Sequence, residues 1–346
     1  MTVIIFIIIL AVLIASHEFG HFIVAKTAGI KVEEFGLGLP PRAIGRKWGE
    51  TLYSLNWIPF GGFVRIFGED PASLEELHDG GNEGSFSSKS KLVQAAVILA
   101  GIFFNILLAF ILLWAGFIIG LPASISAFPD ETLEDIALTI TNVMPGSPAE
   151  AAQVPIGAHI INFDKPEDMI IFVDAHKGQE VLVSTDRGDF KIVPAPKLGI
   201  EMDLVGTLHL SFFDALWQAS VSTYELFYQT SFGIIKFLGS VIVGQGSLSG
   251  VAGPVGIAGA VGEASRQGFG AVLYITALIS LSLAAINLVP FPALDGGRLL
   301  FVIIESIKGS PIRPRIVNAF NLAGFSLLIL LMLFVTYHDI AKLMLS

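Results

Sequence analysis

The chain contains no cysteine and has few charged residues. Of its 346 residues, 14% are charged and 53% are hydrophobic, whereas soluble domains average about 25% charged residues. The lack of cysteine excludes disulfide frameworks, thiolate metal sites and cysteine nucleophiles, so any metal must be held by histidines and carboxylates. Basic residues are also scarce, and the net charge of −10 argues against nucleic acid as a partner. The composition therefore excludes a soluble globule and indicates a membrane protein.

Four predominantly apolar runs are long enough to cross a bilayer, which takes about 20 residues. We predict transmembrane helices at residues 1–25, 92–122, 269–297 and 316–338. A fifth uncharged run, Phe237–Gly262, is rich in glycine, which favours packed loops and short helices over a span.

The distribution of charge predicts the orientation of these helices. No basic residue precedes the first apolar run, so we expect a retained helix rather than a signal peptide. Residues 26–91 carry eight Lys and Arg, and the short segment 298–315 is also basic, as cytoplasmic loops are. Residues 121–270 carry seven Lys and Arg against seventeen Asp and Glu, which indicates an external region. Four spans with both termini outside, including the tail 339–346, fit this pattern.

The sequence of the external region predicts a small β-rich domain at 123–206, followed by amphipathic helices and a glycine-rich loop at 207–268. Strands are expected at residues 138–142, 157–162, 180–184 and 190–193. The segment Pro145-Gly-Ser-Pro-Ala149 predicts a turn and a helix start. This order resembles a PDZ domain, with an ordinary small β-rich domain as the alternative.

The first helix contains the pattern His17-Glu18-Phe19-Gly20-His21. Histidines at positions i and i+4 share one helix face and can hold one Zn²⁺, with the intervening glutamate as general base. The pattern also occurs by chance, and a helical histidine is often only hydrogen-bonded. Ionisable residues in a spanning helix are costly, however, which favours a functional role.

A catalytic zinc normally has three protein ligands, so a third must be found. Asp295 lies where the third apolar run ends, among two prolines and two glycines that break the helix. With four spans, it falls at the same membrane face as His17 and His21. A helix cap or turn is the alternative role for Asp295. The other histidines are predicted to be solvated or locally bonded: residues 78, 159, 176, 209 and 338.

The two motifs together resemble the site-2 family of intramembrane zinc metalloproteases. The first span contains HExxH, and a later span contains Asn287-Leu-Val-Pro-Phe-Pro-Ala-Leu-Asp-Gly-Gly297. The resemblance extends along nearly the whole chain to the bacterial regulator-of-sigma-E protease subgroup. It implies that zinc is the cofactor, with His17, His21 and Asp295 as its ligands and Glu18 as the base. It also implies that Asn287 and Pro290 lie near the substrate backbone.

The chain departs from this subgroup in two places. The second span reads Ala100-Gly-Ile-Phe-Phe-Asn105 where the family usually has Ala-Gly-Pro-x-x-Asn. Well-studied members have two PDZ domains, whereas the region 121–210 has room for one. Regulation is therefore expected to differ.

A cytoplasmic β-hairpin is predicted around Gly61-Gly62. Two β-prone runs, Thr51–Phe60 and Phe63–Phe67, flank this pair. Both runs are too apolar to be exposed to water. The resemblance implies that this loop dips into the membrane beside the metal. The edge formed by Gly61, Gly62 and Phe63 could pair with an unwound substrate, or the hairpin could only plug the helix bundle.

The leading hypothesis is a zinc-dependent endopeptidase of the bacterial inner membrane that cleaves transmembrane substrates. The resemblance suggests an anti-sigma factor or a signal-peptide remnant as substrate. The expected partners are these substrates, the lipid bilayer and a peptide C-terminus at the PDZ-like domain. The alternative is a non-catalytic membrane scaffold or transporter subunit whose PDZ-like domain recruits partners.

Overall fold

A computed structural model describes residues 1–69, 84–129, 131–144, 146–195, 197–244 and 253–345. The chain forms two compact units, each made of three segments. The first unit comprises residues 1–113, 219–247 and 275–336, and the second comprises residues 114–218, 248–274 and 337–346.

Four helices in the described part of the chain are long and apolar enough to cross a membrane. They are α1 (Thr2–Thr27), α2 (Lys91–Ile119), α7 (Phe269–Leu288) and α9 (Pro314–Leu345), the last qualifying over Pro314–Ala341. The four apolar helices expected from the sequence are therefore present, as befits a membrane protein.

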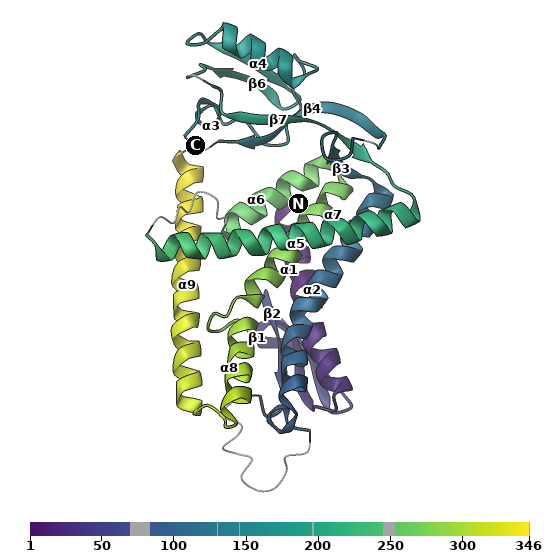
Figure 1. Ribbon diagram of the computed structural model, residues 1–346, viewed down its shortest axis with the longest axis vertical. Helices are drawn as coiled ribbons and strands as arrows, with labels where there is room; N and C mark the ends of the chain where they lie inside the picture. The colour runs from purple at the N-terminus through teal and green to yellow at the C-terminus, as the bar shows by residue number, and fades with distance from the viewer. Residues whose placement is uncertain (70–83, 130, 145, 196, 245–252, 346) are drawn as a thin grey trace. The chain divides into compact units, whose positions relative to one another are not determined.

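The third predicted segment, 269–297, is not one helix. Helix α7 ends at Leu288, and Asp295 begins a separate helix, α8 (Asp295–Lys308). Pro290 and Pro292 lie in the break, where proline lacks the N–H that would continue the helix. The segment between the third and fourth apolar helices is thus largely helical. In the first unit α8 stands beside α9, where the rings of Phe301 and Phe320 lie 5.2 Å apart (Figure 1).

The glycine-rich fifth run is divided among several elements. Its start belongs to helix α5 (Phe212–Ile242), and its end lies in helix α6 (Pro254–Gln267). Residues 245–252 lie outside the described residues. Neither α5 nor α6 is among the four described helices that could span a membrane, although α5, with 31 residues, is not the short helix expected at the start of the run.

The predicted hairpin around Gly61-Gly62 is wrong. Strand β1 (Val32–Trp48) pairs antiparallel with β2 (Thr51–Ile66), and the two-residue turn lies at Gly49 and Glu50, where Gly49 has φ +62°. Gly61 and Gly62 lie inside β2.

The two β-prone runs that flank the glycine pair do not pair with each other. Residue Leu37 pairs with Leu55 on one side and with Gly62 on the other. The first half of β1 is therefore inserted between the two halves of β2. The sequence analysis missed this strand because Val32–Leu37 lies outside both runs.

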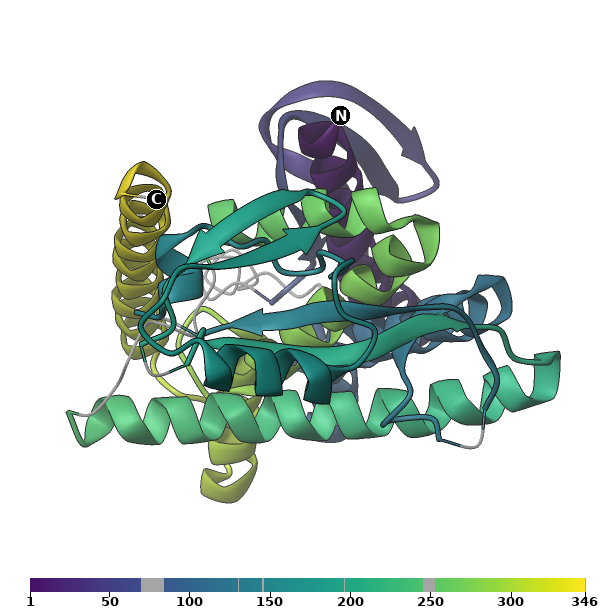
Figure 2. The same ribbon diagram turned by 90° about the horizontal axis from the view of Figure 1, so that it is seen from above.

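The second unit contains a small β-rich domain. Its three-stranded antiparallel sheet has the order β3 (Leu121–Ser124), β7 (Ile200–Leu208), β4 (Leu133–Val143), and a separate hairpin joins β5 (Val181–Thr185) to β6 (Gly188–Ile192). Helix α4 (Pro166–Ala175) packs beside β7 (Figure 2). Buried side chains from all these layers, such as Ile140, Met169 and Val183, form one core.

Most predicted elements of this domain are present. Ser147 caps the short helix α3 (Pro148–Ala151) by accepting a hydrogen bond from Glu150 N, although residue 145 of the predicted turn lies outside the described residues. The strand expected at 157–162 is reduced to single bridges, which His159 makes to Thr139 and Ile160 makes to Thr185.

Candidate metal centre

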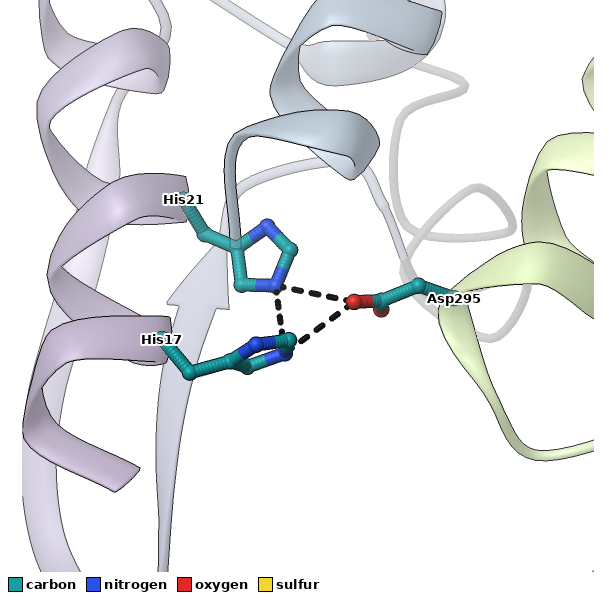
Figure 3. Close-up of side chains that lie close together, drawn as sticks. All are labelled: His17, His21 and Asp295. Carbon is teal, nitrogen blue, oxygen red and sulfur yellow. Dashed lines mark hydrogen bonds and ion pairs between the residues drawn. The ribbon is translucent and has the colours of Figure 1, made fainter. Parts of the chain in front are cut away.

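The two histidines of the HExxH pattern point the same way from α1. One helical turn separates His17 from His21, and their Nε2 atoms lie 3.2 Å apart (Figure 3). His21 is buried, with 7% of its surface exposed. The 3.6-residue helical period places both side chains on one face of the helix.

Asp295 reaches the same point from α8. Its Oδ2 atom lies 3.0 Å from Nε2 of His17 and 3.3 Å from Nε2 of His21 (Figure 3). Asp295 is buried, and 9% of its side chain is exposed. The structure thus brings together the three side chains that the sequence analysis singled out.

Two glycines allow the break before α8 to fold back tightly. A Cβ added to Gly296 would lie 2.2 Å from the carbonyl oxygen of Val289, and one added to Gly297 would lie 2.2 Å from that of Phe291. No larger residue fits either position without movement of the backbone. The Asp-Gly-Gly sequence therefore positions the carboxylate as well as supplying it.

The three groups fit a zinc ion. Zinc bonds to histidine nitrogen and carboxylate oxygen are about 2.0–2.2 Å long, so ligands of a tetrahedral site lie about 3.3–3.6 Å apart. The ligand atoms here are separated by 3.0–3.3 Å. Among the described residues, this is the cluster of histidine and carboxylate groups close enough to hold a metal. Two imidazoles and one carboxylate would leave the fourth position of a tetrahedral zinc site for water.

The three side chains line a cavity of about 390 Å³. Glu18 also lines it, as do four of the five predicted substrate-binding residues: Gly61, Gly62, Phe63 and Asn287. The fifth, Pro290, is exposed and is not among the lining residues.

Strand β2 approaches α1 closely at this cavity. A Cβ added to Gly62 would lie 2.7 Å from Cγ2 of Ile14 and 3.1 Å from Cγ of Glu18. The glycine pair therefore matters for the close approach of β2 to Glu18, rather than for a turn.

The sequence analysis missed an ion pair at the cavity wall. Arg298, one turn after Asp295, pairs with Glu69. Its Nη1 also lies 3.8 Å from Oδ1 of Asp295. The helical spacing of Asp295 and Arg298 was visible in the sequence, whereas no local pattern connects either residue with Glu69.

The other histidines lie away from this cluster wherever their side chains are described. Nδ1 of His159 lies 2.9 Å from Oγ1 of Thr139, and Nδ1 of His176 lies 2.8 Å from the carbonyl oxygen of Phe172. His209 lies 3.9 Å from Glu134. These local bonds agree with the expectation, while His78 and the side chain of His338 lie outside the described residues.

Comparison with known proteins finds one family and several relatives that are similar over most of the chain. The model of peptidase family M50 matches residues 5–331. The zinc metalloprotease RasP of Oceanobacillus iheyensis is 31% identical, with 99% of this chain and 100% of that protein covered. RasP of Shouchella clausii is 29% identical, with 99% of each chain covered. A Clostridium perfringens relative is 34% identical over 95% of each chain.

Proposed function

The chain belongs to peptidase family M50, and we propose that this membrane zinc metalloprotease cleaves a peptide bond within or beside a transmembrane helix of its substrate. His17, His21 and Asp295 hold the zinc, and Glu18 is the general base. Family membership also removes the alternative of a non-catalytic scaffold or transporter subunit.

One observation carries this proposal: three zinc-binding groups converge from two helices on a cavity that also contains Glu18. The histidines come from an apolar helix long enough to span a bilayer. Charged and ionisable groups in such a helix are costly unless they face a cavity, and here they do.

The chemistry divides between the metal and the protein. A bound zinc ion polarises a carbonyl and lowers the pKa of a water molecule to about 7. Glu18 accepts the proton of the attacking water and later delivers it to the leaving amine. His17 and His21, from one rigid helix, keep the reacting groups within reach of Glu18. The Arg298 guanidinium faces Oδ1 of Asp295, the oxygen that does not face the histidines, and so orients this carboxylate.

Strand β2 offers a place for an unwound substrate. Its end, Gly62–Ile66, pairs with β1 on one side, and no other described strand pairs with its second edge. An extended substrate could add to this edge as a further strand and present its backbone to the cavity. Asn287 lines the same cavity and could bond the substrate backbone. Gly62 and Phe63 belong to this paired end, and Gly61 lines the cavity beside them. We propose these three residues, together with Asn287 and the exposed Pro290 in the break after α7, as the substrate contacts.

The natural substrate class that we propose is an anti-sigma factor or a signal-peptide remnant in the bacterial inner membrane. Support comes from the resemblance to the regulator-of-sigma-E subgroup and from the full-length similarity to RasP proteins. The charge distribution supports external termini, with the basic segments 26–91 and 298–315 in the cytoplasm.

We further propose that the β-rich domain of the second unit is a PDZ-like gate. Support comes from strands β4, β5 and β6 and from the capped helix α3, which lie where the sequence analysis expected them. Such a domain can obstruct substrates with bulky external parts and can capture a newly exposed C-terminus by strand addition.

Metal removal tests the proposed function. The purified protein is expected to contain about one zinc and to cut a model transmembrane helix inside its apolar segment, as mass spectrometry of the products would show. A chelator should abolish cleavage, and added zinc should restore it, because the water is activated only at the metal. Cleavage that persists after zinc removal, or that occurs only in soluble loops, contradicts the proposal.

Removal of the β-rich domain tests the gate. Residues 133–208 contain the whole of β4 and β7, and a flexible Gly/Ser linker replaces them. Zinc content and cleavage of short substrates should be unchanged, because these residues contribute no ligand, while substrates with a folded external domain should now be cut. If both kinds of substrate stay uncut although zinc is bound, the domain positions substrates and the gate is wrong.

A further inference from the structure

Three residues of α2 face the histidine pair on successive helical turns. Val97, Gly101 and Asn105 are spaced four apart and therefore share one face of the helix. The carbonyl oxygen of Val97 lies 2.8 Å from Nδ1 of His21, and Nδ2 of Asn105 lies 3.3 Å from Nδ1 of His17. Both imidazoles are thus in contact with α2 through the nitrogen that faces away from Asp295.

Gly101, between these two contacts, allows the rings to lie against the helix. A Cβ added at this position would lie 2.4 Å from Nε2 of His21 and 2.7 Å from Cε1 of His17. Gly20 of the HExxH pattern allows a similar approach, because its added Cβ would lie 2.4 Å from the carbonyl oxygen of Ala100. The close packing of α1 on α2 therefore fixes where the imidazoles lie.

Zinc binding requires a particular tautomer of each histidine. The Nε2 atoms face Asp295 and must carry no proton when they bind a metal, so each Nδ1 must carry one. The carbonyl of Val97 can only accept a hydrogen bond, so it selects the correct tautomer of His21. His17 needs an acceptor in the same way.

Asn105 can provide that acceptor by a rotation of its amide. Asn105 is 1% exposed, and its Oδ1 is buried without a hydrogen-bond partner. The oxygen and nitrogen of an amide are nearly equal in size, and their assignment follows from the hydrogen-bond network. Exchange of the two atoms would direct Oδ1 at Nδ1–H of His17 and give the unpartnered oxygen a donor.

We propose that Asn105 is a positioning residue that accepts a hydrogen bond from Nδ1–H of His17 and so holds Nε2 of His17 available for zinc. The inference rests on the proposed function, because it presumes that His17 binds the metal. Helix α7 supports the position of Asn105, since Oγ of Ser280 donates to its backbone carbonyl at 2.7 Å. Partners of this kind on metal-bound histidines typically change metal affinity by about 10–100-fold.

Two substitutions separate the acceptor role from other roles of Asn105. Asn105→Leu keeps the volume and removes both polar atoms, whereas Asn105→Asp keeps an acceptor and removes the donor. Zinc affinity is measured on folded, detergent-solubilised protein by competition with a chromophoric chelator. We expect affinity to fall about 10–100-fold in Asn105→Leu and to remain near wild type in Asn105→Asp. Asn318→Leu, which replaces an exposed asparagine of α9, is the matched control and should bind zinc normally.

The results distinguish this inference from the proposed function. Wild-type protein that binds no zinc, or His17→Ala that binds it normally, contradicts the proposed metal site. If wild type binds zinc, equal affinity in Asn105→Leu overturns the positioning role. A loss in Asn105→Asp as large as in Asn105→Leu shows that Asn105 acts as a donor and also overturns it. If Asn105→Leu does not fold, Asn105→Ala takes its place with the same expectations.

Discussion

Substitution of Glu18 by glutamine is expected to slow peptide-bond cleavage by about 10²–10⁴-fold while zinc remains bound, since this is the usual contribution of general acid–base catalysis. Glutamine is close to glutamate in shape and can still form hydrogen bonds in the cavity that Glu18 lines. It cannot accept a proton from the attacking water or return one to the leaving amine. The three residues that we propose as ligands are unchanged in this variant. Cleavage rate and zinc content, measured on one preparation, provide the test.

Glu167→Gln is the matched control for this substitution. Glu167 is an exposed residue of α4 in the β-rich domain, and its substitution should change neither the cleavage rate nor the zinc content. Cleavage at the wild-type rate by the Glu18→Gln protein would contradict the role of Glu18 as base. Loss of zinc from this variant would instead indicate that Glu18 helps to hold the metal.

Asp295→Ala should lose zinc almost completely and lose cleavage with it. The substitution removes the anionic group that lies 3.0 Å from His17 and 3.3 Å from His21, leaving two neutral ligands. Metal affinity should fall by at least about 100-fold, more than the usual loss on removing an outer-shell partner. Asp295→Glu keeps a carboxylate with one more methylene and should retain part of the metal. The measurements are metal content after dialysis and cleavage at saturating zinc.

Asp174→Ala controls for the loss of one carboxylate elsewhere. Asp174 pairs with Lys177 on the surface, and both side chains are more than half exposed. Because Asp295→Ala also leaves Arg298 without one of its partners, the fold of the variant must be checked by its thermal unfolding. A folded Asp295→Ala protein with full zinc and full activity would place the third ligand elsewhere.

The sequence predicted the grouping of His17, His21 and Asp295 better than it predicted the strands beside these residues. The spacing of His17 and His21 is local, because any α-helix brings residues four apart onto one face. Asp295 was predicted from a different argument: with four spans, this residue falls at the same membrane face as the two histidines. The predicted hairpin failed because pairing depends on distant residues: Leu37 lies between Leu55 and Gly62. Two β-prone runs around a glycine pair do not reveal a third strand inserted between them.

The sequence by itself determined the class of protein, the four apolar helices and the chemical identity of the three proposed ligands, because hydropathy, charge and helical periodicity act over short distances. Only the tertiary structure decided that Asp295 begins a new helix, that β2 approaches Glu18 through Gly62, and that α2 contacts both imidazoles. The role of Gly101 illustrates the difference. A glycine within an apolar helix indicates that something packs closely against it. Which side chain does so depends on how α1 and α2 pack together. That packing is set by contacts between residues far apart in the sequence, such as the hydrogen bond from Ser16 to the carbonyl oxygen of Phe104, 88 positions away.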